Sequence, residues 1–144
     1  MLDNKGAKWF KQMQDMKRDL ENEEDIKLLV NTFYESVNQD ELLSPVFNDF
    51  SRINWEKHLP LMYSFWSTVL LGSMAYKGQP FPKHMSLPIE RRHFSRWVEL
   101  FCKTTDTLFE GNKATEAKQK ATSIAHVFQV RLGMSDILIK QPAL

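Results

Sequence analysis

Apolar side chains recur at intervals of three and four residues along most of this chain, and that period constrains the fold more than any other feature. One run shows it plainly, because its spacing places Ile26, Leu29, Val30, Phe33 and Val37 on one face of a helix. No stretch alternates convincingly between apolar and polar residues as a half-buried strand would, and no internal repeat interrupts the pattern. The sequence therefore predicts an all-α domain.

The expected helices follow from this spacing and from the residues that begin or end helices. Their ranges are 7–20, 23–38, a short helical turn over 42–47, a long helix that ends near Gly72, and then 94–109 and 113–132. Either Ser51 or Asn54 is placed to cap the helix that ends near Gly72. Pro60 lies inside that helix, which predicts either a bend or a later start.

The composition excludes several classes of protein. With 144 residues we expect one domain, and 19 basic against 18 acidic residues leave a formal net charge of +1. This balance favours neither nucleic acid nor an anionic membrane as a partner, and no apolar run approaches the roughly 20 residues of a membrane span. A single cysteine, Cys102, excludes an internal disulfide, so we expect a protein of the reducing cytoplasm without a secretory signal.

One histidine, His84, stands between prolines in the segment Gly78-Gln-Pro-Phe-Pro-Lys-His-Met-Ser-Leu-Pro88. Proline fixes φ and disfavours helix in the residue before it, so any helix around His84 spans only a turn or two. A short, stiff platform is typical of a histidine held for a ligand, although a loop histidine at a surface bend has the same spacing. Tyr34 and Trp97 lie on predicted helix faces, either as hydrogen-bond donors toward the interior or as ordinary core aromatics.

Three stretches occur in a distinctive order and spacing. They are Trp55-Glu-Lys-His-Leu-Pro-Leu-Met-Tyr-Ser-Phe-Trp66, then Tyr76-Lys-Gly-Gln-Pro-Phe-Pro-Lys-His84, and then Leu87-Pro88 followed by His93-Phe-Ser-Arg-Trp97. Together they resemble the truncated haemoglobins, specifically the third group of that family, over roughly residues 25–132. The resemblance implies a shortened globin fold, with two helix pairs stacked around haem b. We accordingly expect a helical extension over 1–22, a truncated globin domain over 23–132 and a tail over 133–144.

The resemblance also implies a role for each matching residue. His84 resembles the ligand of the haem iron, and Phe47 resembles the aromatic side chain that packs on the porphyrin. Tyr34 and Trp97 resemble donors to a partly negative bound ligand. His58 resembles the distal histidine, whose role stays open between gating, hydrogen bonding and iron ligation. The other residues expected against the cofactor are Met62, Phe65, Trp66, Leu87 and Arg92, the last of them beside a propionate or else part of a solvated charged run.

Two functions fit this resemblance. The first is redox chemistry on dioxygen, nitric oxide or a related small ligand, such as nitric oxide dioxygenation or peroxide reduction, supported by an external reductase. The second is a non-catalytic carrier or sensor of such a ligand, acting with a partner. Two donors beside the ligand predict slow dioxygen release, which suits chemistry or sensing better than bulk oxygen transport. A haem-free helical interaction module would leave the combination of His84, Tyr34, His58 and Trp97 unexplained.

Other chemistry finds little support in the sequence. Glu90 and His93 have the Glu-x-x-His spacing of di-iron bundles, but the chain has no second such pair. Zinc-ligand spacing, a glycine-rich phosphate loop and a nucleophile elbow are all missing. We therefore do not expect an ordinary hydrolase or kinase.

Overall fold

The computed structural model of this chain describes residues 6, 8, 17–73 and 89–133. All regular structure in these ranges is helical: α2 (Glu23–Gln39), the π-helical turn η1 (Pro45–Phe50), α3 (Trp55–Leu71), α4 (Arg91–Leu108) and α5 (Asn112–Arg131). The all-α prediction is confirmed, and each of these elements lies within a few residues of its expected range. The helix predicted over 7–20 falls largely outside the described residues.

Helix α2 begins where the sequence predicts because Asn22 caps it. Asn22 Oδ1 accepts the backbone N–H of Asp25 at 3.0 Å, and acidic residues fill the first turn, at the positive end of the helix dipole. The predicted apolar face is at most 1% exposed, over Ile26, Leu29, Val30, Phe33 and Val37. Tyr34 follows Phe33 and is buried as well. Helix α2 thus carries the Tyr34 phenol into the interior.

Helix α3 begins at Trp55 and ends at Gly72, whose φ of 77° is a left-handed conformation that glycine adopts without strain. Of the two candidate caps, Asn54 is the one used, and its side chain accepts the N–H of Lys57. Pro60 does not delay the start of the helix. Pro60 is exposed, so water can replace the backbone donor that proline lacks. The first turn therefore stays helical, and it carries both Trp55 and His58.

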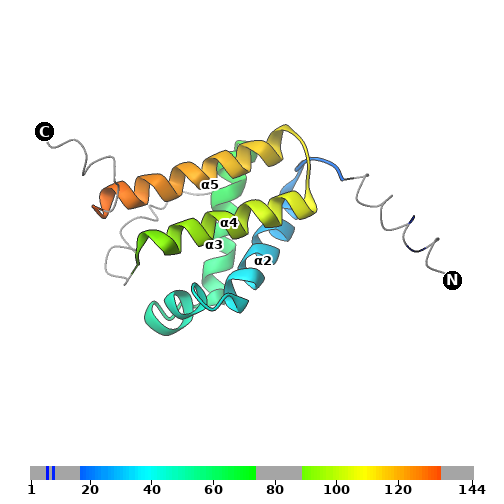
Figure 1. The fold of residues 1–144 in the computed structure, drawn as a ribbon. Coiled ribbons are helices and arrows are strands. Elements are labelled where there is room, and N and C mark those ends of the chain that lie inside the picture. The colour runs from blue at the N-terminus through cyan, green and yellow to red at the C-terminus, as the bar shows by residue number, and fades with distance from the viewer. Residues whose placement is uncertain (1–5, 7, 9–16, 74–88, 134–144) are drawn as a thin grey trace, which may run out of the picture.

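A short loop joins α4 to α5, so the two helices run antiparallel (Figure 1). Within this loop Gly111 has a φ of 144°, and a Cβ atom there would lie 2.5 Å from Asp19 Cγ. The close approach lets the Asp19 carboxylate accept the N–H groups of Lys113 and Ala114, both at 2.8 Å. The segment before α2 thus caps α5 across more than ninety positions of sequence.

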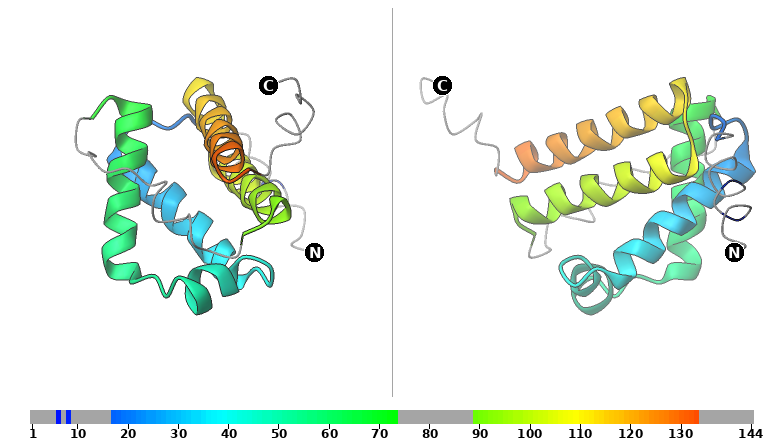
Figure 2. Two further views of the ribbon diagram at one scale, coloured as in Figure 1. Left: turned by 90° about the vertical axis from the view of Figure 1, so that its left-hand side faces the viewer. Right: turned by 45° about the vertical axis from the view of Figure 1, so that its right-hand side comes forward.

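The helices form two layers. Helix α2 contacts α3 and helix α4 contacts α5, while further contacts of α2 with α4 and of α3 with α5 join the pairs. The left view of Figure 2 looks almost along α4 and α5 and shows α2 and α3 as a separate pair. Aromatic rings fill the junction, since Phe101 stacks on Trp66 with centroids 4.8 Å apart and meets Phe33 edge-on at 5.2 Å. This is the two-over-two arrangement expected from the sequence.

Candidate functional site

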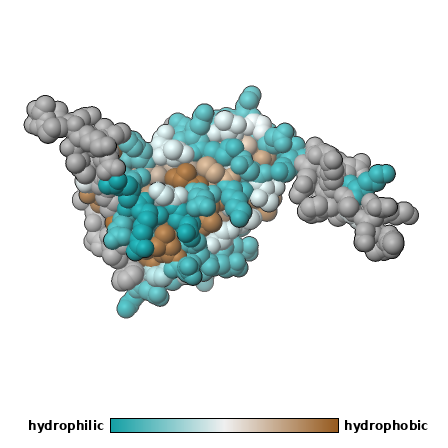
Figure 3. Space-filling view, in the orientation of Figure 1, coloured by the Kyte–Doolittle hydropathy of each residue, from teal (hydrophilic) through white to brown (hydrophobic). Residues whose placement is uncertain are grey.

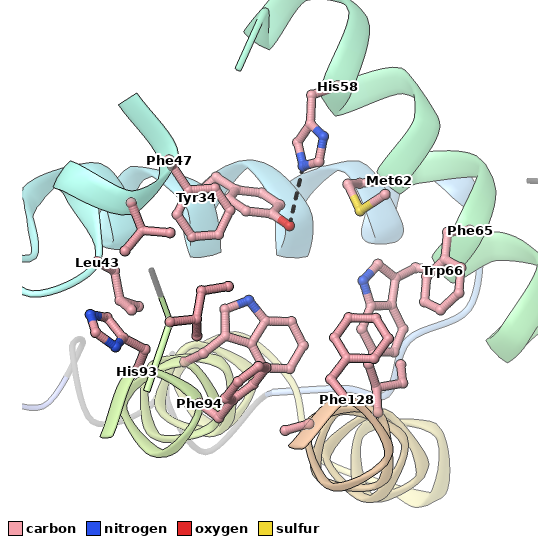
Figure 4. Close-up of a pocket in the computed structure, with 15 residues that line it drawn as sticks. Tyr34, Leu43, Phe47, His58, Met62, Phe65, Trp66, His93, Phe94 and Phe128 are labelled. Atoms are coloured by element: carbon pink, nitrogen blue, oxygen red, sulfur yellow. Dashed lines mark hydrogen bonds between the residues drawn. The ribbon is translucent and has the colours of Figure 1, made fainter. Parts of the chain in front are cut away.

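A cavity of about 840 Å³, its open mouth included, lies between the two helix pairs. Most of its wall is apolar, as is usual for sites that bind small molecules and cofactors. In Figure 4, Tyr34, Phe47, His58 and Met62 lie along one side, opposite Phe94 and Phe128. The lining residues are Tyr34, Leu43, Val46, Phe47, His58, Met62, Phe65, Trp66, Ile89, His93, Phe94, Trp97, Ile124, Ala125 and Phe128.

Two polar side chains from different helices meet at this cavity. The phenol oxygen of Tyr34, on α2, lies 3.5 Å from Nε2 of His58, on α3. This separation is at the long end for a hydrogen bond, so the contact is weak. Burial raises the pKa of the Tyr34 phenol, which therefore stays a neutral O–H at physiological pH. A neutral phenol of this kind can turn its proton toward a ligand in the cavity.

Trp97 supplies a second donor to the same cavity. Its ring packs edge-on against Phe33 and stacks on Phe101, with centroids 5.6 and 5.9 Å away, so packing fixes its position on α4. The indole N–H has no hydrogen-bond partner within the described part of the chain. An indole nitrogen can only donate a hydrogen bond. Trp97 therefore keeps its donor available for a ligand.

The structure brings together most of the residues predicted for the site. Phe47, Met62, Phe65 and Trp66 all line the cavity, together with the three polar residues Tyr34, His58 and Trp97. Their helical spacing places them on inward faces, as the sequence predicts. His84 and Leu87 lie outside the described residues, so their predicted contacts with a cofactor stay predictions.

Arg92 does not line the cavity. It is exposed, and its Nε bonds to Glu90 Oε1 at 2.8 Å on the outer side of α4. Its predicted pairing with a propionate stays a prediction. The neighbouring His93 does line the cavity, and its Nδ1 accepts the backbone N–H of Glu90 at 2.9 Å. The Glu-x-x-His spacing of Glu90 and His93 thus forms the cap of α4.

Sequence reasoning missed much of the opposite wall. Phe94, Ile124 and Phe128 belong to the last two predicted helices and were not assigned to the site, yet they line the cavity. A helical period marks an inward face and does not distinguish close packing from a cavity wall. Several of these side chains are only half buried, and Figure 3 shows hydrophobic surface among hydrophilic side chains on the face that α4 and α5 present. Incomplete packing of these side chains would have distinguished a cavity wall from a closed core. Such packing can be recognised only in the folded structure, and the sequence does not contain it.

The lining fits a flat and largely apolar cofactor such as haem. Aromatic rings on both sides can contact the faces of a planar macrocycle, as Phe47 and Phe94 illustrate. The polar groups gather at Tyr34, His58 and Trp97, where they can address a small ligand. Among the described residues, no three His, Cys, Asp or Glu side chains come together to hold a bare metal ion. None of the described helices has the length and apolar character to span a membrane.

Comparisons with known proteins point the same way. The sequence model of the family described as bacterial-like globin matches residues 19–130 of this chain. The chain is also 35% identical over 118 residues to the group 3 truncated hemoglobin ctb of Campylobacter jejuni, covering 79% of this chain and 93% of that protein. The match extends over the helices that build the cavity.

A solved structure agrees with the sequence comparison. The crystal structure of the group III truncated hemoglobin from Campylobacter jejuni superposes with a TM-score of 0.74 at 34% identity. The superposition covers 81% of this chain and 95% of that chain. Sequence and backbone thus lead to the same fold independently of the cavity.

Proposed function

This chain belongs to the bacterial-like globins, in the third group of truncated haemoglobins, and on that premise we propose that it performs redox chemistry on a small diatomic ligand. Membership of the family implies haem binding and small-ligand binding. We further propose that the haem is of the b type, held without a covalent link, since Cys102 is the only cysteine. Burial raises the pKa of the Cys102 thiol, which makes this residue a poor nucleophile and metal ligand.

A single observation carries the proposal: three polar side chains, each from a different helix, line one largely apolar cavity, where a bound ligand can contact all three. The Tyr34 phenol makes one hydrogen bond among the described residues, the 3.5 Å contact with His58, and the Trp97 N–H has no partner there. A half-buried indole N–H at an open cavity can bond to water, or to a ligand that takes the place of that water. The three residues are therefore assigned to ligand binding.

Bound haem would supply the iron at which a diatomic ligand binds and reacts. The chain would hold that group through His84, which the motif resemblance implies as the ligand of the iron, and through the aromatic wall that includes Phe47. The apolar lining excludes bulk water, and low polarity strengthens every hydrogen bond within the cavity. These residues would thus bind the haem, orient it and shield its bound ligand from water.

The two donors set how long a partly negative ligand stays. A hydrogen bond to a charged group contributes roughly 1.5 to 3 kcal/mol, and about 1.4 kcal/mol corresponds to a tenfold change in equilibrium constant. Tyr34 O–H and Trp97 N–H therefore predict slow dioxygen release. A ligand held in this way is suited to reaction with a second molecule and poorly suited to bulk transport.

His58 competes with the ligand for Tyr34. When His58 Nε2 is unprotonated it accepts from the phenol, and when Nε2 carries a proton it can itself donate into the cavity. The tautomer of His58 thus determines whether one or two donors of this pair reach a ligand. The long 3.5 Å contact makes the exchange inexpensive.

Purified protein tests the proposal directly. Haem-loaded protein should show a Soret band and bind carbon monoxide in the ferrous state, and His84→Ala should change the ferrous spectrum. Dioxygen dissociation should accelerate about tenfold or more in Tyr34→Phe and in Trp97→Phe, as loss of a charge-assisted bond requires. If neither variant releases dioxygen faster, these residues are not the donors.

A second measurement separates redox chemistry from the alternative, a non-catalytic carrier or sensor that acts with a partner. Dioxygen-loaded protein mixed with nitric oxide should give nitrate and ferric protein, and an external reductase should then restore the ferrous state. Peroxide reduction is assayed in the same preparation. Because a dioxygen-loaded carrier or sensor also reacts once with nitric oxide, the criterion is repeated turnover in the presence of the reductase, which a carrier or sensor would not show.

A further inference from the structure

Trp55 lies behind the polar side of the cavity and does not line it. Its ring meets His58 edge-on, with centroids 5.5 Å apart and planes at 85°. It also contacts Tyr34 at 5.3 Å and stacks on Phe47 at 6.1 Å with planes at 25°. One indole thus touches three residues that do line the cavity. Aromatic pairs in such geometries attract beyond the area they bury, so the position of Trp55 restricts theirs.

A hydrogen bond fixes Trp55 in this place. Its indole Nε1 donates to Asn48 Oδ1 at 2.8 Å. The amide nitrogen of Asn48 in turn donates to Asn38 Oδ1 at 2.8 Å and to the Ser44 carbonyl at 3.1 Å. These bonds set the orientation of the Asn48 amide, so its oxygen faces Trp55. The indole is therefore anchored to η1 and, through Asn38, to the last turn of α2.

His58 is the residue that this anchoring affects most. Trp55 and His58 lie three positions apart in the first turn of α3, where their side chains are neighbours on one helix face. His58 lines the cavity yet is only half buried, so its imidazole lies where the cavity meets solvent. An imidazole on a helix surface can swing outward by a rotamer change. The Trp55 ring is packed against it and restricts that movement.

We infer that Trp55 is a positioning residue that holds the His58 imidazole against Tyr34 and thereby limits ligand access to the cavity. Trp55 acts through its packing on His58 and its hydrogen bond to Asn48. The inference rests on the proposed function, since access matters only if a ligand binds here. According to this inference, Trp55 influences the rate of ligand uptake although it does not line the cavity.

The test is carbon monoxide association with the ferrous, haem-loaded protein after flash photolysis. Trp55→Ala removes the ring, and Trp55→Phe keeps a ring but loses the N–H that Asn48 accepts. We expect association about threefold to tenfold faster in Trp55→Ala, the scale of one edge-on aromatic contact, with Trp55→Phe in between. Tyr63→Phe is the matched control, because it removes a hydrogen bond to Asn31 from an aromatic residue of the same helix outside the cavity.

The infrared band of bound carbon monoxide gives a second readout that a merely structural role would not move. Polar groups near the ligand shift this band, so a released His58 should add a second band in Trp55→Ala and leave the Tyr63→Phe spectrum single. Wild-type rates and a single band in both Trp55 variants would overturn the inference while the proposed function stands. If Trp55→Ala fails to fold, Trp55→Phe decides by the same criteria. Failure of the wild type to bind carbon monoxide would overturn both proposals.

Discussion

Two clusters of polar residues in this small domain differ in how completely they are hydrogen-bonded by the chain itself. The cap cluster consists of Arg18, Asp19 and Asp25, before and within the first turn of α2. The pocket cluster consists of Tyr34, His58 and Trp97. Asp25 accepts two bonds from Arg18, at 2.7 and 2.8 Å, and one from the N–H of Glu21 at 2.8 Å. In the pocket cluster the Tyr34 phenol has only a 3.5 Å contact with His58, and the Trp97 indole N–H has no partner in the described ranges.

The difference shows what each cluster is for. Polar groups that stabilise a fold are saturated by the chain itself, as in the cap cluster, because unpaired buried groups cost free energy. Groups that serve a ligand must keep capacity for it, and the fold carries that cost. The pKa values agree with this division. The Arg18 guanidinium, working against burial, holds the pKa of Asp25 below its usual range, whereas burial alone raises the pKa of Tyr34.

The largest expected effect on stability comes from breaking the cap cluster. Asp25→Ala removes a carboxylate that is 7% exposed and leaves the N–H of Glu21 without its acceptor. We expect a loss of about 2 to 3 kcal/mol in the free energy of unfolding, mostly from the backbone bonds, because Arg18 is half exposed. Urea unfolding of the haem-free protein measures it. Glu24→Ala, at the adjacent exposed position, is the control, and equal midpoints for the two variants would contradict the saturated-cluster interpretation.

A smaller effect should appear with pH at Asp19. Burial opposes its ionisation, but the N–H groups of Lys113, Ala114 and Leu20 outweigh burial and hold the pKa of Asp19 below its ordinary 3.8. A carboxylate with a lowered folded pKa contributes stability above its unfolded pKa, and that contribution is lost as pH falls through the folded value. Asp19→Asn should therefore cost about 1 kcal/mol at pH 7, and the difference from wild type should shrink below about pH 4.

Urea midpoints from pH 7 to pH 2 check the Asp19 prediction. Asp49→Asn, on an exposed carboxylate of η1, provides the control and should follow the wild-type curve. A constant difference between wild type and Asp19→Asn across this range would show that charge is not what caps α5.

Local signals predicted the fold where they were sufficient. The helical period predicted α2 and a glycine predicted the end of α3 at Gly72, because each signal lies within a short stretch of neighbouring residues. The Asp19 cap of α5 was not predicted, since it joins residues more than ninety positions apart and no short pattern marks it. Long-range polar contacts of this kind depend on the fold being already known.

The site was predicted unevenly for the same reason. Tyr34, His58 and Trp97 each lie on a periodic helix face, and the structure brings all three to one cavity, while their roles there stay predictions. Trp55 lies in the same motif, but its role emerges only from its contacts with Asn48 and His58. The axial role of His84 and the boundary of the extension at residue 22 stay predictions.

The smallest effect on stability should come from a substitution in the pocket cluster. This substitution tests most directly whether the pocket cluster differs from the cap cluster. Tyr34→Phe removes an O–H whose only bond among the described residues is 3.5 Å long, and it leaves the packed ring in place. Because a weak bond is lost and a buried polar group is removed with it, the free energy of unfolding of haem-free protein should change by less than about 0.5 kcal/mol. The same variant should release dioxygen about tenfold faster or more, as proposed above. A loss of stability comparable to that of Asp25→Ala would mean that the phenol serves the fold and that the two clusters do not differ in kind.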